Sequence, residues 1–435
     1  MSGRTTVSRY SKSLWTRRRL LGTGAAALAA PVIAPRRAWA AGNEIRIGFV
    51  SPTTGPISGF GAGDDYVFQT LQPVFDQGVD IDGKHYDIKI IRKDSQSNPN
   101  RATEVASELI LDDEVHLMLS SSTADTVLPV TDQCEVNEVP SLSADTPWDA
   151  FFFGRGGNPA KGFDWTYHFF WGGAQVVNSY ASLWGQIDTN MKVGLMMSND
   201  SDGVAMSNPD IGFAAQLKNN GLEVIDLGLH EPLSDDYSAQ IGKLKDAGVD
   251  IITGIFLPPD WTTFWVQAAQ LGFRPKAATI AKALLFPSSI EALGDAGLGH
   301  STEIWWSPAH PYPSAIDGSS SQALADGFEA ATGRQWVQPM GFKYALLEVM
   351  LDTLRRCADP TDPGAMMEAI KTTDMKTLVG PVNFQTGPVP NVSQTPVVGG
   401  QWVKGSKFPY DLKINENKYA PDIQVQAPFE ALKYS

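Results

Sequence analysis

Residues 115–148 read VHLMLSSSTADTVLPVTDQCEVNEVPSLSADTPW, and this stretch decides the fold. Two short apolar runs, residues 115–119 and 139–142, are each followed by a polar run, SSST at 120–123 and SADT at 143–146. An apolar run of this length that ends in turn-forming residues predicts a buried β-strand followed by a polar loop. In an open α/β sheet small ligands bind at the carboxyl ends of the strands. We therefore expect a candidate binding site in these two loops.

The chemistry of the two loops suits reversible capture of a small polar ligand. A helix N-terminus offers unpaired N–H groups, and neighbouring hydroxyls add donors and acceptors for a carboxylate. The alternative is that the same residues serve only as helix caps and turns, where Ser, Thr and Asp are also favoured. The candidate residues in the loops are Ser120, Ser121, Ser122, Thr123, Ser143, Ala144, Asp145 and Thr146.

The rest of the chain alternates predicted strands with predicted helices in two series. This alternation predicts an α/β fold with mostly parallel sheets. The irregular, glycine-rich stretch 151–162 separates the series and marks a lobe edge. Strands are predicted at 45–50, 86–91, 192–197, 222–227, 250–256 and 277–285, and helices at 208–220, 237–247, 261–271, 320–332, 341–358 and 363–371.

The first forty residues have the features of an export signal. Three arginines, Arg17, Arg18 and Arg19, precede an apolar run at 20–34 that is shorter than the ~20 residues needed to span a bilayer. The small-x-small site at 38–40 follows. We expect export by the twin-arginine route, cleavage after Ala40, and a mature protein in the periplasm with no direct membrane insertion.

The charge and the cysteines of the chain restrict its partners and its cross-links. The 435 residues hold 34 basic and 48 acidic side chains, and removal of the first forty leaves 26 basic against 48 acidic, a net −22. That balance argues against nucleic acid and anionic membranes as partners. The two cysteines, Cys134 and Cys357, either form a disulfide or are two separately buried thiols.

Motifs of common active sites are absent from the sequence. There is no Walker A pattern, no G-x-S-x-G elbow, no H-E-x-x-H pair, and no G-x-G-x-x-G between a strand and a helix. The run SNDSDG at 198–203 is better explained as a turn than as a calcium loop, since Pro209 stands where a bidentate Glu belongs. We expect no catalytic residues, no metal and no cofactor.

The order of these pieces resembles the periplasmic substrate-binding proteins of the branched-chain amino acid and amide type, which serve ABC importers. IRIGFVSPTTGPISGFG resembles that family's opening strand and loop, LSSSTADT and PSLSADTP its two ligand loops, and KTLVGPVNFQTG its last crossing. The resemblance implies two Rossmann-like α/β lobes with parallel sheets, a type I periplasmic binding protein joined by a three-segment hinge. The implied limits are 1–40 for the signal, 41–168 and 307–380 for lobe 1, and 169–306 and 381–435 for lobe 2.

The resemblance also implies roles for single residues. Phe60 matches an opening-loop aromatic that borders the ligand, and Ser120 matches the serine that hydrogen-bonds the ligand carboxylate. Ser143 and Asp145 match the two contact positions of the second loop, with Ala144 and Thr146 beside them.

Two residues of the other lobe depart from the family pattern. Asp202 falls where amino-acid binders have an aromatic residue, and Lys282 falls where they have an acid that captures the ligand ammonium group. An ammonium ion facing Lys282 would be repelled. Our hypothesis is that the ligand is not a simple α-amino acid. Lys282 then pairs with a second anionic group, or with Asp145 or Asp202, unless it is a solvated surface lysine.

Aromatic residues suggest a planar ligand. A cluster that ends at Trp171 crowds the first expected crossing at 165–171, and Trp305 and Trp306 lie at the second. Stacking on a planar ligand uses such residues. Trp261, Phe264 and Trp265 have the spacing of a helix face, which more often means core.

We therefore expect a monomeric solute-binding protein that delivers a small carboxylate, aromatic if the tryptophans contact it, to an ABC permease. The alternatives are a branched-chain amino acid or amide binder and a ligand-sensing receptor subunit.

Overall fold

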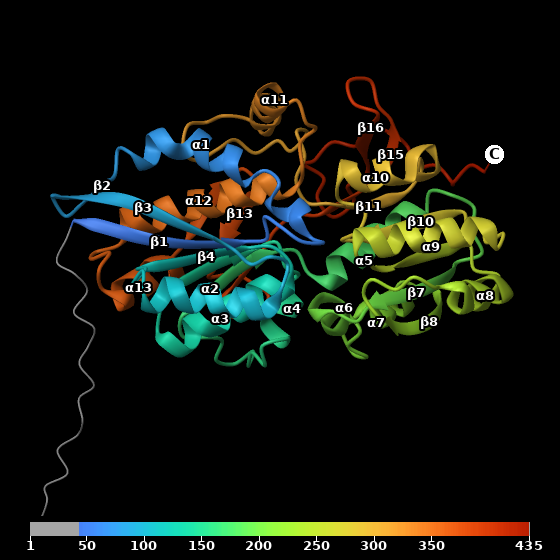
Figure 1. The fold of residues 1–435 in the computed structure, drawn as a ribbon, viewed down its shortest axis with the longest axis horizontal. Helices are drawn as coiled ribbons and strands as arrows, with labels where there is room; N and C mark the ends of the chain where they lie inside the picture. The colour runs from blue at the N-terminus through green and yellow to red at the C-terminus, as the bar shows by residue number, and fades with distance from the viewer. Residues whose placement is uncertain (1–42, 435) are drawn as a thin grey trace, which may run out of the picture. The chain divides into compact units, whose positions relative to one another are not determined.

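Two seven-stranded sheets organise the computed structural model, which describes residues 43–434 (Figure 1). The first sheet has the order β14-β6-β5-β4-β1-β3-β2 and the second the order β16-β15-β11-β10-β9-β7-β8. In each sheet the strands nearest the centre pair in parallel, as predicted from the strand and helix alternation. Each lobe contains one sheet, which is the two-lobed α/β architecture that the sequence resemblance implies. The two lobes belong to one compact unit.

The strand bounds follow the apolar runs of the sequence. The first sheet contains β1 (Glu44–Ser51), β2 (Val79–Ile81), β3 (Lys84–Asp94), β4 (Leu117–Ser121), β5 (Ser141–Ala144), β6 (Thr166–Phe170) and β14 (Val392–Gln394). The second contains β7 (Lys192–Ser198), β8 (Glu223–His230), β9 (Ile251–Ile255), β10 (Ala277–Ala281), β11 (Ser301–Ile304), β15 (Val398–Lys404) and β16 (Tyr410–Glu416). A separate hairpin joins β12 (Asp374–Thr377) to β13 (Gly380–Asn383).

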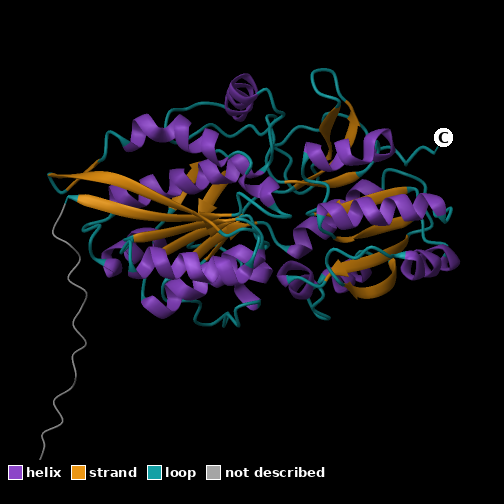
Figure 2. Cartoon of the chain, in the orientation of Figure 1, coloured by secondary structure: helices purple, strands orange, loops and turns teal. Residues whose placement is uncertain are grey.

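Helices cover both faces of each sheet, so that strands form the middle layer (Figure 2). In the first lobe, buried side chains of α2 (Pro99–Leu111) and α3 (Ala124–Asn137) pack on one face of the sheet, and those of α1 (Asp64–Phe75) and α12 (Pro339–Arg356) pack on the other. In the second lobe α5 (Gly173–Trp184) and α7 (Phe213–Asn219) lie opposite α8 (Ser238–Ala247) and α9 (Pro258–Gln270). The remaining helices are α4 (Trp148–Phe153), α6 (Ser201–Met206), α10 (Pro287–Leu293), α11 (Ser321–Thr332), α13 (Pro363–Lys371), and the 3-10 turns η1 (Ser58–Gly61) and η2 (Gly294–Gly297).

The chain passes between the two sheets three times. The passages lie between β6 and α5, between β11 and α11, and between β14 and β15. The pairing of β14 with β6 places residues 392–394 in the first sheet. The residue limits of the lobes given above stay a prediction.

Two strands next to the candidate loops end later than the sequence predicts. β4 runs to Ser121 and β5 to Ala144, because Ser120 and Ser121 pair in register with Ser143 and Ala144. Backbone groups this deeply buried need ladder partners. The hydroxyl-rich segments are therefore strand ends followed by short turns.

Three further sequence expectations concern the thiols, the tryptophan face and the signal. Cys134 and Cys357 are both buried and unpaired. Trp261, Phe264 and Trp265 pack in the core of the second lobe, as their helix spacing favoured. The predicted export signal and its cleavage after Ala40 lie outside the described residues. Within residues 43–434, no helix combines the length and apolarity needed to cross a membrane.

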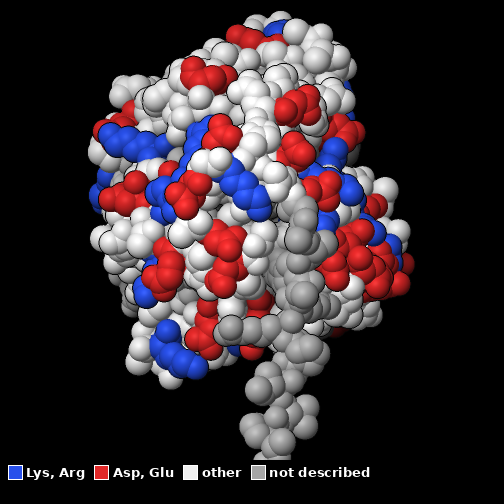
Figure 3. All heavy atoms as spheres, turned by 90° about the vertical axis from the view of Figure 1, so that its left-hand side faces the viewer, with Lys and Arg blue, Asp and Glu red and all other residues white. Residues whose placement is uncertain are grey.

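Charges of both signs are mixed on the molecular face that Figure 3 shows. Acidic side chains lie among basic ones there, and the described residues on that face form no continuous basic patch.

Candidate functional site

A cavity lies where the carboxyl ends of the strands of both sheets meet, and its atom-free space, including open solvent at its mouth, is about 360 Å³. Its lining residues come from both lobes. The predominantly apolar part of the lining is Phe60, Pro147, Phe170, Trp171, Ile255, Ala281, Leu285 and Trp305, and the polar part is Thr123, Asp145, Asp202, Lys282 and Glu303.

The cavity brings together half of the residues that the sequence nominated. Those on its wall are Phe60, Thr123, Asp145, Trp171, Asp202 and Lys282. Those outside the lining are buried beside it: Ser120, Ser121, Ser122, Ser143, Ala144 and Thr146. Several of these six make hydrogen bonds between the segments beside the cavity. Thr146 Oγ1 donates to the carbonyl of Ser122 at 2.7 Å, and Ser143 Oγ lies 2.9 Å from His168 Nδ1.

Asp145 and Lys282 occupy matching positions in the two lobes. Asp145 follows the last residue of β5 and Lys282 follows the last residue of β10. Both have a left-handed backbone, with φ of 71° and 66°. Non-glycine residues rarely adopt this conformation, and those that do often cluster at binding sites. Each lobe thus presents one charged side chain to the cavity from a strained turn.

In the first lobe Asp145 is neutralised by a lysine that sequence inspection missed. Lys343 Nζ lies 3.3 Å from Asp145 Oδ2, 2.9 Å from the carbonyl oxygen of Ser121 and 3.8 Å from Asp64 Oδ1. Ser121 Oγ also donates to Asp145 Oδ2. Burial raises the pKa of Asp145, and Lys343 and Ser121 oppose that rise. The available sequence signal was one lysine within the apolar face of the predicted helix 341–358, since a buried ammonium group requires an acidic partner.

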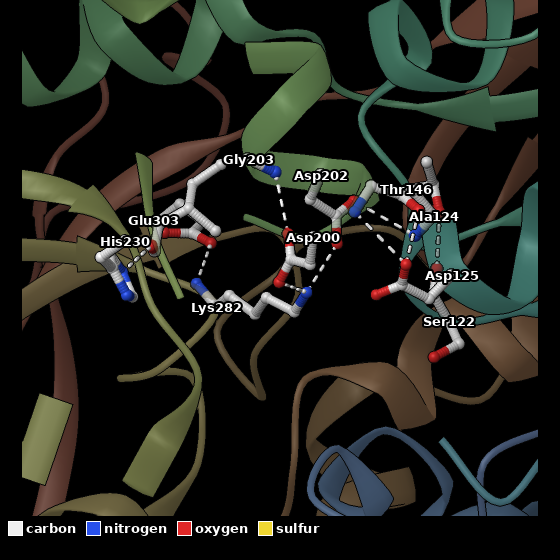
Figure 4. A network of polar contacts seen from close by, with 12 residues as sticks. Ser122, Ala124, Asp125, Thr146, Asp200, Asp202, Gly203, His230, Lys282 and Glu303 are labelled. Atoms are coloured by element: carbon white, nitrogen blue, oxygen red, sulfur yellow. Dashed lines mark hydrogen bonds and ion pairs between the residues drawn. The ribbon is translucent and has the colours of Figure 1, made fainter. Parts of the chain in front are cut away.

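In the second lobe Lys282 is held between two aspartates (Figure 4). Its Nζ lies 2.9 Å from Asp200 Oδ2 and 2.8 Å from Asp202 Oδ2, and all three side chains are buried or nearly so. Burial would lower the pKa of Lys282, but the two carboxylates outweigh it and raise that pKa. The pairing with Asp202 is one of the alternatives that the sequence left open. The pairing with Asp145 is not formed, because Lys343 takes that carboxylate.

Asp202 also connects the two lobes. Its Oδ1 accepts a hydrogen bond from the N–H of Ala124 at 3.1 Å, at the start of α3. In return, Ser201 at the start of α6 donates its N–H and its hydroxyl to Asp125 of α3. Burial raises the pKa of Asp202 to about 6, against the effect of Lys282. Each helix start is therefore capped by a carboxylate from the opposite lobe.

The acidic cluster at this junction already contacts an ammonium group of the protein itself. Asp125, Asp200 and Asp202 bring carboxylate oxygens within 4.8 Å of one another, an arrangement that can hold a metal ion. The ammonium group of Lys282 contacts two of the three carboxylates, and Asp200 also caps α6 by accepting the N–H of Gly203 at 2.9 Å. Run 198–203 is thus a helix-capping turn, as the sequence favoured.

Aromatic side chains form part of the cavity wall. Phe170 packs edge-on against Trp305, with ring centroids 5.2 Å apart, and lies 4.9 Å from the ring of Trp171. Phe60 joins from the opening loop and packs on Phe286 at 5.3 Å. Trp171 and Trp305 lie at the first two passages between the lobes, so these two members of the aromatic wall belong to the crossing segments.

A family model described as "Periplasmic binding protein" matches residues 44–404. No curated protein matches the chain. Among solved structures, a leucine-binding protein from Thermotoga maritima is 20% identical with a TM-score of 0.68, and the match covers 85% of this chain and 97% of that one.

Two solved structures from Rhodopseudomonas palustris contain aromatic acids. A solute-binding protein of an ABC transporter from strain BisB5, in complex with 3,4-dihydroxybenzoic acid, is 18% identical with a TM-score of 0.66, covering 86% of this chain and 99% of that one. A second, in complex with 4-hydroxybenzoate, is 14% identical with a TM-score of 0.64, covering 90% and 97%. At these identities the likeness concerns the fold.

Proposed function

Because this chain belongs to the periplasmic binding protein family, we propose that it captures a small organic solute in the interlobe cavity and delivers it to an ABC importer. The observation that carries the proposal is the cavity itself, which both lobes line at the carboxyl ends of their strands. The family consists of binding proteins and not of enzymes, and it places the protein outside the cytoplasm. We propose that the chain is exported by the twin-arginine route into the periplasm. We also propose that the mature protein is soluble and monomeric there.

The proposed ligand is a small carboxylate without an α-amine, with an aromatic acid favoured. The aromatic wall of Phe60, Phe170, Trp171 and Trp305 supports a planar ligand, since flat rings pack well on such surfaces. The complexes of two structural neighbours with hydroxybenzoic acids point in the same direction. The alternative, a branched-chain amino acid or amide, is favoured by the likeness to a leucine-binding protein.

Ligand binding would act by stabilising the closed arrangement of the lobes. A micromolar ligand has a binding free energy of about −8 kcal/mol. It shifts the lobes toward closure only by its differential affinity for the closed form. The closed form would then dock on the permease.

A thermal-shift screen tests this function. The mature protein, residues 41–435, is heated with aromatic acids, dicarboxylates, amides and branched-chain amino acids. At about a hundredfold excess over Kd a true ligand adds about 2.7 kcal/mol, which raises Tm by several degrees. We expect an aromatic acid to raise Tm and leucine not to. A shift with leucine alone would favour the alternative, and no shift with any compound would contradict solute binding.

The role of Lys282 in this selection has its own test. The Lys282→Glu variant is screened against the same compounds. We expect its ligand spectrum to change, because the variant gathers three carboxylates where the protein has one ammonium group between two carboxylates. If the variant binds the same compounds as the unmodified protein, Lys282 does not select the ligand.

A further inference from the structure

The start of α3 is the natural anion site of the cavity, and the protein fills it itself. Helix N-termini favour a negative group because their first N–H groups lack partners. Thr123, the residue before α3, makes no side-chain cap. Asp202 of the other lobe supplies the missing acceptor, with Oδ1 at 3.1 Å from the N–H of Ala124. A carboxylate that entered the cavity would have to compete with Asp202 for this position.

The ammonium group that lines the cavity, that of Lys282, is also already paired within the protein. Lys282 is the basic member of the lining, and its Nζ lies within 2.9 Å of Asp200 and Asp202. Behind the wall, Lys343 is held by Asp145 and Asp64. Asp202 and Lys282 both line the cavity, and together they have the charges of an amino-acid head group, while Asp200 contacts the ammonium group of Lys282 from outside the lining.

The unpaired polar atoms lie elsewhere on the wall. Four buried atoms of lining residues have no hydrogen-bond partner among the described residues: Thr123 Oγ1, Asp145 Oδ1, Trp171 Nε1 and Trp305 Nε1. The two indole N–H groups are donors only, a carboxylate oxygen accepts, and a hydroxyl does either. Buried polar atoms of this kind normally have partners, which makes them candidates for ligand contacts.

We infer that the Asp202–Lys282 ion pair is a specificity determinant that takes the place of a zwitterionic head group and excludes α-amino acids. The site then accepts a flat molecule with no ammonium group. An acceptor on that molecule accepts hydrogen bonds from the indole N–H groups of Trp171 and Trp305. A donor such as a phenolic hydroxyl donates to Asp145 Oδ1. This inference rests on the proposed function, since it assumes that the solute occupies the interlobe cavity.

The test compares two ligands on variants that lack the ion pair. Titration calorimetry measures 4-hydroxybenzoate and leucine binding to the unmodified protein, to Asp202→Ala/Lys282→Ala, and to Asp202→Asn. The double variant removes both charges of the pair, and Asp200, which loses its contact with the ammonium group, still accepts the N–H of Gly203. Asp202→Asn keeps the size of the side chain and an acceptor for Ala124 if the double variant does not fold. The matched control is Lys192→Ala/Glu223→Ala, which removes an exposed ion pair of the same lobe.

We expect the unmodified protein and the control to bind 4-hydroxybenzoate and not leucine. The double variant should keep 4-hydroxybenzoate affinity to within roughly tenfold and gain measurable leucine binding, because the N–H of Ala124 at the start of α3 becomes free. Asp202→Asn should weaken the discrimination in the same direction but by less, because its neutral amide oxygen competes less strongly than a carboxylate for the N–H of Ala124.

Three outcomes would overturn the inference, and they are distinguishable. Leucine binding to the unmodified protein would refute the inference and leave solute binding intact. A loss of 4-hydroxybenzoate binding of more than roughly a hundredfold in the folded double variant, without gain of leucine, would show that the pair contacts the acid directly. If no compound of the full screen binds the unmodified protein, both the proposed function and the inference fail.

Discussion

At the scale of single residues, the site depends on charges that are buried in compensated groups. Lys343 and Asp145 are fully buried side chains that join α12 to the end of β5. Desolvation makes such pairs expensive to form, so their net contribution to stability is modest. The removal of one partner is different, because it leaves the other charge uncompensated in the interior.

Lys343→Met should therefore destabilise the protein by about 3–5 kcal/mol. The methionine fills similar space but leaves Asp145 and Asp64 without their cation. Urea unfolding measures the change. The second variant, Lys343→Met/Asp145→Asn, should recover part of the loss. Lys404→Met, which breaks an exposed pair with Asp295, serves as the control and should leave the midpoint unchanged. A loss below about 1 kcal/mol for Lys343→Met would contradict the buried-charge account.

The two lysines also show what the sequence reveals about a site and what it does not. The pairing of Lys282 with Asp202 is one of the hypotheses that the sequence supports, because both residues fall on ligand positions of the family pattern. Lys343 lies 198 residues from Asp145 and on a helix that the sequence marks only as apolar. No local pattern connects the two, since their meeting depends on how α12 packs against the first sheet.

At the scale of elements, α12 fixes the position of the second passage between the lobes. Gly341 in its first turn packs against Trp306, and a Cβ at Gly341 would lie 2.1–2.4 Å from three ring atoms. Trp306 is fully buried, and its Nε1 donates to Ser321 at 3.1 Å. Both Gly341 and Trp306 are buried in the core.

Gly341→Ala should destabilise the protein by about 1–3 kcal/mol through overpacking, although alanine favours helix. Gly242→Ala is the matched control, because Gly242 lies inside α8 and a Cβ there meets no atom within 4 Å. That control should be neutral or stabilising by up to about 1 kcal/mol. Thermal unfolding measures the Tm of both variants. Equal Tm values for Gly341→Ala and Gly242→Ala would show that Trp306 shifts to accommodate the added methyl group at little cost in stability.

Sequence periodicity located most elements but not their ends. β4 and β5 extend into the hydroxyl-rich runs because ladder pairing satisfies the buried backbone there. β10 is shorter than the predicted strand 277–285, since the chain turns sharply at Lys282. β14 has three residues and leaves no pattern, so its place beside β6 depends on the tertiary fold.

At the scale of the whole molecule, two sets of buried groups oppose each other as pH changes. Burial lowers the pKa of His116 to about 4 and of His168, His300 and His310 to about 3. Burial raises the pKa of Asp64, Asp149 and Asp202 to about 6 and of Glu348 to about 7. The histidines stabilise the fold above their unfolded pKa of about 6.5, and this stability is lost as pH falls. The carboxyl groups stabilise it below their unfolded pKa of about 4, and this stability is lost as pH rises through about 6 to 7.

Between about pH 4.5 and about pH 6, each histidine makes the free energy of unfolding rise with pH, and each of these carboxyl groups makes it fall. The slope is about 1.4 kcal/mol per pH unit for one group. Asp149→Asn removes one carboxyl contribution while its amide oxygen can still accept the N–H of Gly173, which lies 2.6 Å from Asp149 Oδ2. The variant's free energy of unfolding should therefore rise with pH more steeply than that of the unmodified protein, by about 1.4 kcal/mol per pH unit. Urea unfolding at several pH values in this window measures both slopes, and the exposed Asp210→Asn controls for the loss of one carboxylate. Parallel curves for Asp149→Asn and the unmodified protein would mean that Asp149 ionises in the folded state as it does in the unfolded chain.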